Sequence, residues 1–375
     1  MKLGRDHRVS DKTSLLDLTY DQLTELLVSW GGPAYRADQI WSWLYRSLAA
    51  DFQEMTNLSK GLRERLADAT LLRTMDPLEE RVSSDGLTRK VLFALRDNQT
   101  VESVLMRYER RHTACISTQV GCAFDCAFCA TGQSGFVRNL TAGEIVEQVL
   151  YFARQLREGM SNELRVTRKV DPSLVPRHSS LTNVVFMGMG EPLANYEATW
   201  QAVETLTHDG GFNLGARRIT ISTVGVVPGI RRLAEEGKQI GLAVSLHAAT
   251  DELRDRLIPI NRRYPLAQLM AACRYYLERT GRRISFEYAL INGINDSPEQ
   301  ARQLVHLLDR LFCHVNLIPL NPVHESPYQP SPRGRIMAFQ AELNRLKAPN
   351  TLRVERGVDI RAGCGQLRCQ QMPSG

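Results

Sequence analysis

The sequence predicts an α/β protein whose main body is a partial, open βα barrel preceded by a small N-terminal helical domain. From about residue 113, short apolar runs alternate with amphipathic segments, whereas residues 1–75 carry apolar positions at three- and four-residue spacing. Short apolar runs separated by amphipathic helices are typical of parallel strands covered by crossover helices. We count six or seven βα units in the sequence. A closed barrel of this kind has eight, so we expect an incomplete one.

The first part of the chain is predicted to be helical over 14–29, 36–47 and 58–69, with a Gly-Gly-Pro turn at 31–33. Period-two stretches such as TRKVLFAL and TVESVLMRY then predict small β-structure within 79–109. We therefore divide the chain into a helical accessory domain (1–75), a small β linker region (76–112), the partial barrel with a C-terminal loop (113–367) and a polar tail (368–375).

The barrel elements follow from the same alternation. Thr141 and Glu144 form the T-x-x-E pattern of a capping box, which places the start of the first long barrel helix. In such folds the chemistry lies where strands end and loops begin. The predicted elements are, in order, TACISTQV, TAGEIVEQVLYFARQL, NVVFMGMG, YEATWQAVETLT, RRITISTVGV, GIRRLAEEG, QIGLAVSLHA, a helix within 265–279, RISFEYALI, SPEQARQLVHLLDR, HVNLIPL, a helix near 334–346, and TLRVERG.

Composition indicates a soluble, cytoplasmic protein. The chain has 375 residues, of which 43% are apolar and 23% charged, and a net charge of +6, which favours a polyanionic partner only weakly. We find no run of eighteen apolar residues, and MKLGRDHRVSDK is too polar for a signal or transit peptide. In a reducing compartment, clustered cysteines are more often metal ligands or redox groups than structural disulfides.

Four of the eight cysteines lie in CISTQVGCAFDCAFCATG, residues 115–132, and three of them are spaced C-x3-C-x2-C. A zinc site would use Cys115 or His112 as a fourth ligand, but zinc cysteines usually come as two separated pairs, and no second pair follows. Inert core thiols give no reason for such clustering. An iron–sulfur cluster uses thiolate ligands, and three of them leave one iron open to a small molecule. The spacing favours the cluster among these three interpretations.

A C-x3-C-x2-C triplet after the first strand of a chain of βα units resembles the radical S-adenosylmethionine (radical SAM) superfamily. The resemblance implies that Cys122, Cys126 and Cys129 hold a 4Fe–4S cluster, with Phe128 at an aromatic position common in the superfamily. It further implies that the open iron binds S-adenosylmethionine and that one electron cleaves this cofactor to a 5′-deoxyadenosyl radical.

Four strand-end motifs, MGMGEP, ISTVG, VSLHA and LIPLNP, are candidates for holding S-adenosylmethionine. Glu191 can accept from the cofactor's ammonium, and glycine backbones permit close approach. His247 taken alone would more often be a structural histidine. The expected cofactor-binding residues are Gly190, Glu191, Ser222, Ser245, Leu246, His247 and Asn321.

Longer motifs narrow the resemblance to the RlmN/Cfr family of RNA methyltransferases, and best to its RlmN branch, over roughly residues 14–367. They are CATGQSGFVRNLTAGEIVEQV, VFMGMGEPLANY, RRITISTVGVVPGI, SLHAATDELRDRLIPINRRYP, NLIPLNP and DIRAGCGQL. The branch methylates C2 of an adenosine in the peptidyl-transferase centre of 23S rRNA and of an adenosine next to the anticodon in some tRNAs. A Cfr-type enzyme methylates C8 of the same rRNA adenosine and confers antibiotic resistance, whereas PLANY, SPYQP and VERGVDI favour the RlmN branch.

The resemblance also assigns roles to residues that the cluster leaves unused. Cys364 in the CGQL motif would carry a methyl group taken from one of two S-adenosylmethionines used per turnover, and Cys115 would resolve the protein–RNA adduct by forming a disulfide with it. Glu102 in TVESV would accept the C2 proton, although from the sequence alone it is more simply a solvated strand glutamate. From a different functional class, a non-catalytic iron–sulfur or zinc RNA-binding protein would need the cysteine triplet but neither Cys115 nor Cys364.

The expected partners are 23S rRNA, tRNA and a reduced electron donor such as flavodoxin or ferredoxin, for a monomer with no membrane association. Phosphate contacts are expected from Arg217, Arg218, Arg231, Arg232, Arg262, Arg263, Arg282, Arg283, Arg333 and Arg335, although most such charges are simply solvated. Two features depart from the family pattern. Residues 155–182 look longer than usual and predict a surface loop, and Gly363 replaces a larger small residue, which we expect to loosen the loop before Cys364. Cys273 and Cys313 are expected in the core, and Cys369 has no assigned role.

Overall fold

One sheet forms the centre of the computed structural model, in the order β14-β13-β12-β11-β10-β9-β6-β5-β4-β3, ten strands over the described residues. The structure describes the whole chain except residues 1–11, 168–180, 322, 324–325, 355 and 368–375. The strands from β6 through β9 to β14 all pair in parallel, and β3, β4 and β5 continue the sheet antiparallel from β6. The predicted partial βα barrel is confirmed.

The parallel strands alternate with helices, as the sequence predicts. Each helix covers the sheet between two consecutive parallel strands, so the carboxyl ends of the strands lie at one edge of the sheet. The elements are β6 (Arg111–Cys115), α5 (Ala142–Thr167), β9 (Asn183–Phe186), α6 (Tyr196–Thr207), β10 (Ile219–Thr223), α7 (Val227–Glu235), β11 (Gly241–Ser245), α8 (Asp251–Leu257), α9 (Leu266–Thr280), β12 (Ile284–Leu290), α10 (Pro298–Leu307), β13 (Cys313–Pro319), α11 (Arg333–Arg345) and β14 (Asn350–Leu352).

The first long barrel helix, α5, begins where the capping box predicts. Thr141 N donates to the Glu144 carboxylate at 2.9 Å, and Glu144 N donates to Thr141 Oγ1 at 3.2 Å. The helix continues to Thr167, so residues 155–167 are helical and the surface loop expected from 155 is wrong for this part. Residues 168–180 lie outside the described residues.

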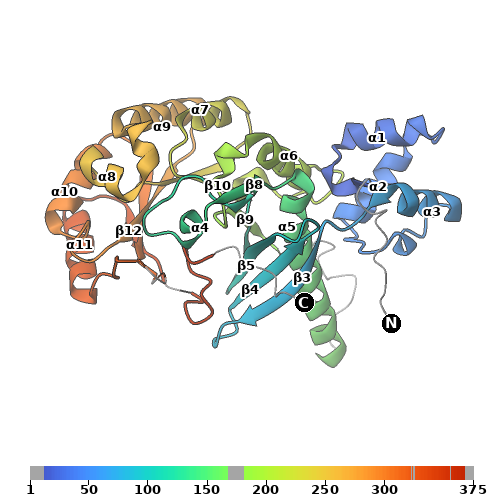
Figure 1. Cartoon of the computed structure of the whole chain (residues 1–375), viewed down its shortest axis with the longest axis horizontal. Helices are drawn as coiled ribbons and strands as arrows, with labels where there is room; N and C mark the ends of the chain where they lie inside the picture. The colour runs from blue at the N-terminus through green and yellow to red at the C-terminus, as the bar shows by residue number, and fades with distance from the viewer. Residues whose placement is uncertain (1–11, 168–180, 322, 324–325, 355, 368–375) are drawn as a thin grey trace.

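The N-terminal helices form a lobe against α5 and α6 (Figure 1). They are α1 (Tyr20–Ser29), α2 (Arg36–Tyr45) and α3 (Lys60–Ala69), joined by the short parallel pair β1 (Thr13–Ser14) and β2 (Thr70–Leu71). Arg154 of α5 donates to the carbonyls of Leu48 and Ala49, and Gly143 N donates to Asp17. Their buried apolar side chains belong to the same core cluster as those of the barrel. Over the described residues, every helix is too short or too polar to cross a membrane.

Residues 76–112, predicted to be a small β linker region, form strands of the central sheet. They contribute to β3 (Met75–Val82), β4 (Thr88–Leu95), β5 (Thr100–Tyr108) and the start of β6, and β5 pairs with β6 from Val104↔Cys115 to Tyr108↔Arg111. The sheet is therefore continuous across residue 112. The domain limits drawn from the sequence stay a prediction, and the three antiparallel strands extend the barrel sheet (Figure 1).

Candidate active site

The cysteine loop is closed by a small sheet of its own. The predicted strand TACISTQV divides into β6 and β7 (Gln119–Gly121), and β7 pairs antiparallel with β8 (Phe136–Asn139) on the far side of the loop, after the short helix α4 (Ala130–Gln133). Cys122 N donates to Gly135 O at 2.9 Å where the two strands meet. A loop whose two ends are paired in this way presents its cysteines from a fixed base.

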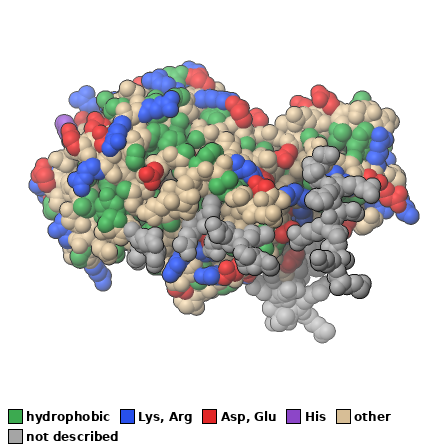
Figure 2. Space-filling model, viewed as in Figure 1, with side chains coloured by type: hydrophobic (Ala, Val, Ile, Leu, Met, Phe, Trp, Pro, Cys, Tyr) green, Lys and Arg blue, Asp and Glu red, His purple; other side chains and the backbone are tan. Residues whose placement is uncertain are grey.

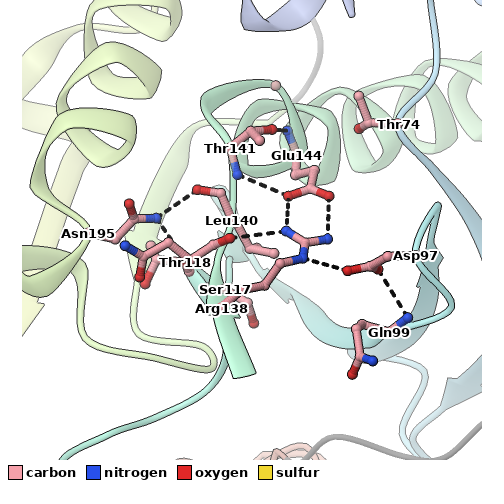
Figure 3. Close-up of polar contacts among 12 residues, drawn as sticks. Thr74, Asp97, Gln99, Ser117, Thr118, Arg138, Leu140, Thr141, Glu144 and Asn195 are labelled. Carbon is pink, nitrogen blue, oxygen red and sulfur yellow. Dashed lines mark hydrogen bonds and ion pairs between the residues drawn. The ribbon is translucent and has the colours of Figure 1, made fainter. Parts of the chain in front are cut away.

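Arg138 anchors β8 to the rest of the molecule (Figure 3). Its guanidinium makes two hydrogen bonds of 2.8 Å to the Glu144 carboxylate at the start of α5, and Nε donates to Asp97 at 2.6 Å. Asn195 Nδ2 donates to the carbonyls of Thr118 and Leu140, both at 2.8 Å, on either side of the loop. A bidentate Arg–carboxylate pair fixes orientation as well as position, so the loop base is rigid.

One cavity at the carboxyl ends of the parallel strands brings most of the candidate residues together. About 990 Å³ of space there, open solvent included, is free of protein atoms. All the residues that the sequence assigns to cluster, cofactor or catalysis line it, except Cys115, Glu102 and Leu246. The lining members are Cys122, Cys126, Cys129, Gly190, Glu191, Ser222, Ser245, His247, Asn321 and Cys364.

The three loop cysteines fit an iron–sulfur cluster. Burial raises the pKa of Cys122 to about 12 and that of Cys126 well above the ordinary value, so both need a bound cation to become thiolates. Over the described residues, no group of three His, Cys, Asp or Glu side chains is arranged for a single metal ion. All three cysteines line the same cavity, which leaves space beside them for a larger cluster.

Glu191 lies directly beyond β9 at the cavity wall. Its carboxylate accepts from Val224 N at 2.7 Å and from Leu193 N at 3.1 Å, and burial raises its pKa to about 7 against these hydrogen bonds. Gly190 precedes it with φ of +94°, and a Cβ there would lie 2.5 Å from a Gln119 side-chain carbon. The glycine is therefore required by both backbone conformation and space, and it lets the chain turn tightly into the cavity.

His247 is held neutral just after β11. Its Nδ1 accepts from Ala289 N at 2.8 Å, which leaves the proton on Nε2, and burial lowers its pKa to about 3. The ring also contacts Phe128 edge-on at 4.8 Å, which links the cysteine loop to this strand end. The backbone φ of +55° is unusual for a residue with a Cβ. His247 thus supplies a neutral N–H donor at the cavity wall.

Ser222 and Ser245 line the same wall from β10 and β11. Leu246 is fully buried in the apolar core and is not among the residues that line the cavity, and its carbonyl accepts from Arg254 Nε at 3.2 Å. Arg254 is itself completely buried and donates to Val224 O at 2.7 Å as well. One guanidinium therefore ties two of the strand-end loops together.

Asn321 holds the loop that carries Cys364. Its Nδ2 donates to Cys364 O at 3.1 Å, and its Oδ1 is buried without a partner in the described residues. A Cβ on Gly363 would lie 2.5 Å from Asn321 Nδ2. The Asn321 amide thus packs where a side chain at position 363 would lie, and the expected loosening of the loop stays a prediction.

Cys115 ends β6 and is 8% exposed, outside the cavity lining, whereas Cys364 is exposed at the cavity. Burial raises the pKa of Cys115 to about 12, and the Arg353 guanidinium opposes that rise. Arg353 follows β14, lines the cavity and interacts electrostatically with both thiols. The fold thus brings a cation near two cysteines that are far apart in the sequence.

Glu102 is buried, so the interpretation as a solvated strand glutamate is wrong. It lies on β5 with 1% of its side chain exposed and pairs with Lys90 Nζ on β4 at 2.8 Å, the lysine being 8% exposed. Lys90 also donates to Arg361 O at 3.2 Å in the C-terminal loop. The proposed base and the loop that carries Cys364 therefore share one ammonium group.

Sequence reasoning missed Arg353 and Glu287, both of which line the cavity. Glu287 is an acidic residue within the apolar strand sequence RISFEYALI, and that contrast was the available signal. Of the arginines expected to contact phosphates, Arg232 pairs with Glu197 and Arg335 with Asp296. Figure 2 shows Lys and Arg on this face with Asp and Glu between them, so no single basic stripe marks an RNA path in this view.

Comparison with known proteins identifies the family. Residues 13–72 match the ribosomal RNA large subunit methyltransferase N-terminal domain, and residues 175–305 match the radical SAM superfamily. The chain is 49% identical to a probable dual-specificity RNA methyltransferase RlmN of Chloroflexus aurantiacus, over 96% of this chain and 94% of that protein. It is 50% identical to the dual-specificity RNA methyltransferase RlmN 1 of Myxococcus xanthus, over 95% and 94%.

A solved structure agrees with these relatives. The crystal structure of a radical SAM methyltransferase from Sphaerobacter thermophilus is 50% identical, has a TM-score of 0.87 and covers 95% of this chain and 99% of its own. The chain therefore belongs to the RlmN family of radical SAM RNA methyltransferases, which work with a 4Fe–4S cluster and S-adenosylmethionine.

Proposed function

We propose that this RNA methyltransferase transfers a methyl group to C2 of an adenosine in the peptidyl-transferase centre of 23S rRNA and of an adenosine next to the anticodon in tRNA. The observation that carries the proposal is that Cys364 shares a cavity with the cysteine triplet while one arginine of that cavity interacts with both Cys364 and Cys115. Cys364 lines the same space as Cys122, Cys126 and Cys129, and Arg353 interacts with both Cys364 and Cys115. A protein that only bound RNA through a cluster would have no use for this second pair of cysteines.

The chemistry of the target explains why both the cysteine triplet and this second pair are needed. C2 of adenine is an electrophilic carbon without a nucleophilic lone pair, so a sulfonium methyl group cannot be transferred to it directly. When bound to Cys122, Cys126 and Cys129, the cluster would supply the electron that cleaves S-adenosylmethionine to a 5′-deoxyadenosyl radical, and would take one electron back as the product is released. The reaction also needs a methyl carrier, a base and a resolving thiol, and the chain offers one residue for each.

Cys364 is the proposed carrier. In this proposal the Cys364 sulfur attacks the methyl carbon of one S-adenosylmethionine and releases S-adenosylhomocysteine. The 5′-deoxyadenosyl radical would then take a hydrogen atom from the S-methyl group, giving 5′-deoxyadenosine and a carbon radical that adds to adenine C2. Asn321 and Gly363 fix the backbone next to this sulfur, because the Asn321 amide packs directly against the glycine and donates to Cys364 O. That contact sets where the methyl group lies relative to the cavity.

Glu102 and Cys115 are proposed to release the product. Glu102 takes the C2 proton of the adduct, and the thiolate of Cys115 attacks the sulfur of Cys364, so that a disulfide forms as the carbon–sulfur bond breaks. The electron pair of that bond stays with the former methylene carbon, which takes up a proton and becomes the methyl group on C2. The disulfide must then be reduced before another turnover. Glu191, Ser222, Ser245, His247 and Asn321, with the backbones of Gly190 and Leu246, are proposed to hold S-adenosylmethionine.

The partners follow from this reaction. A reduced donor such as flavodoxin or ferredoxin would supply the electron, and the enzyme would act as a cytoplasmic monomer on rRNA and tRNA. The test is anaerobic reconstitution with iron and sulfide, followed by addition of S-adenosylmethionine, a strong reductant and either an rRNA fragment or a tRNA anticodon hairpin. We expect 5′-deoxyadenosine and 2-methyladenosine, identified by mass spectrometry. A methyl group on C8 would overturn the C2 assignment, and a methylated rRNA fragment beside an unmodified hairpin would remove the tRNA substrate.

A further inference from the structure

Glu287 is a buried carboxylate that no part of the proposed mechanism uses. Its side chain is 5% exposed, and Oε1 accepts from Asn316 Nδ2 at 2.8 Å and lies 3.5 Å from Arg353 Nη2. Oε2 is buried and has no hydrogen-bond partner within the described part of the chain. A charged oxygen left in this way is costly, since leaving a buried acceptor unsatisfied forfeits its full desolvation penalty.

The side chain of Glu287 faces the barrel interior. Successive residues of a strand point to opposite faces, and Ala289, two residues further along β12, lines the same cavity as Glu287. In the sheet register Glu287 lies opposite Ser245 on β11 and Asn316 on β13. Three polar side chains thus lie side by side across three neighbouring strands, and two of them, Ser245 and Glu287, line the cavity, as expected of a binding wall.

Its neighbours place Glu287 on the side of the reactive thiols. Arg353, its ion-pair partner, interacts with both Cys364 and Cys115, and Glu287 itself interacts electrostatically with Cys364. The carbon to be methylated must meet the sulfur of Cys364. The target base therefore has to occupy this side of the cavity, and Oε2 of Glu287 is an acceptor in its wall without a donor among the described residues.

We propose that Glu287 reads the exocyclic amine of the target adenine, with Asn316 and Arg353 as the residues that position its carboxylate. The proposal rests on the proposed function, because it takes the substrate to be an adenosine. In adenine the C6 amine is separated from C2 only by N1 and C6, so a base with C2 at the methyl carrier presents N6–H to the same wall. A guanine or hypoxanthine would turn an O6 acceptor toward the carboxylate and be rejected.

The proposal predicts the effect of an isosteric change. Because Asn316 Nδ2 donates to Oε1, a glutamine at this position keeps its carbonyl oxygen there and turns its NH₂ to the place of Oε2. Glu287→Gln thus puts a donor where the adenine amine needs an acceptor. Glu299→Gln removes one negative charge from an exposed carboxylate that pairs with Arg302, and it serves as the matched control.

The experiment compares two RNA hairpins on the reconstituted holoenzyme. One carries adenosine at the target position in its loop, and the other carries purine riboside, which keeps N1 and C2–H but lacks the amine. Dissociation constants are measured by fluorescence anisotropy. We expect the wild type and Glu299→Gln to bind the adenosine hairpin about 10-fold or more tightly than the purine hairpin, as for one hydrogen bond to a charged group. In Glu287→Gln the ratio should fall to one or below.

A second measurement tests whether Glu287 contacts the cofactor rather than the substrate base. Cleavage of S-adenosylmethionine by the reduced enzyme without RNA should be unchanged in Glu287→Gln, and a loss of cleavage would assign Glu287 to the cofactor and overturn the proposal. Equal binding of the two hairpins by the wild type would overturn it without any variant, even if Glu287→Gln failed to fold. The methylated carbon is mapped in a separate experiment. A C8 product would refute the C2 assignment, whereas the ratio of the two hairpin dissociation constants tests the contact between Glu287 and the amine.

Discussion

The two reactive cysteines are held in opposite ways. Cys115 ends a strand that is paired on both sides, with Val104 of β5 and Val185 of β9. Cys364 lies exposed in a loop that is held by a few contacts, among them Ala130 N donating to Gly365 O at 2.8 Å and Asn321 Nδ2 donating to Cys364 O. Moving Cys115 would break a sheet ladder, whereas moving Cys364 costs a few loop hydrogen bonds. If Cys364 is the carrier and Cys115 the resolving thiol, as we propose, we expect Cys364 to be the one that moves to meet the other.

The largest effect is expected from replacing Cys364, the proposed methyl carrier. Cys364→Ala should lower methylated RNA below detection and form no protein–RNA adduct, because no other described thiol outside the cluster triplet lines the cavity. Iron content should equal that of the wild type. Cys313→Ala, at the half-buried start of β13, is the matched control and should methylate normally. An adduct detected by denaturing gel in Cys364→Ala would show that another residue carries the methyl group.

Replacing Cys115, the proposed resolving thiol, should have the opposite effect on the protein–RNA adduct. Cys115→Ala keeps Cys364 able to react, so RNA should accumulate as a covalent adduct in near-stoichiometric amount and remain after denaturation. Since Cys115 does not line the cavity of the cysteine triplet, iron and sulfide content should be unchanged. Loss of about one quarter or more of the iron in this variant would restore Cys115 as a fourth ligand of the cluster.

A third variant tests the ammonium group shared by base and loop. Lys90→Met leaves the Glu102 carboxylate buried without its cation, and removing one partner of such a pair costs about 3–5 kcal/mol of the free energy of unfolding. We expect a lower thermal midpoint and an adduct that persists, because the Lys90 ammonium no longer holds the proposed base in place. Lys90→Arg retains the charge and should restore release of the methylated RNA. Release at the wild-type rate in Lys90→Met would show that the proposed base, Glu102, acts without Lys90.

The pH dependence of release should report the buried thiol. Burial raises the pKa of Cys115 to about 12, and only its thiolate attacks a sulfur centre. Below that pKa the thiolate fraction rises about tenfold per pH unit, so adduct decay should accelerate by about that factor per unit between roughly pH 7 and 9. Rapid-quench decay of the preformed adduct measures this rate. A rate independent of pH over that range would mean that Cys115 is already ionised when the adduct forms.

The sequence predicts best what depends on neighbours in the chain. The order of strands and helices, the cysteine triplet and the strand-end residues Glu191, Ser222 and Ser245 follow from local spacing and from the rule that parallel strands end at one edge. Glu287 and Arg353 could not be found this way, because their meaning comes from Asn316 and the two thiols on other elements. The same holds for β3 to β5, since antiparallel pairing of β5 with β6 is a tertiary choice that an alternating pattern does not specify.

The role of Gly363 also depends on a residue far away in the sequence, Asn321, and could not be predicted from local spacing. Replacing Gly363 should have the smallest effect of the variants considered. In Gly363→Ala the new Cβ would lie 2.5 Å from Asn321 Nδ2, but the amide is the end of a side chain and can shift. We expect the free energy of unfolding to fall by roughly 1 kcal/mol or less, the low end of the cost of overpacking. The rate of Cys364 methylation should fall modestly, and release by Cys115 should be unaffected. Single-turnover methylation of the protein, measured by intact mass, separates the two steps. If release slowed instead, the Asn321 contact would govern the movement of the loop toward Cys115 rather than the placement of its sulfur in the cavity.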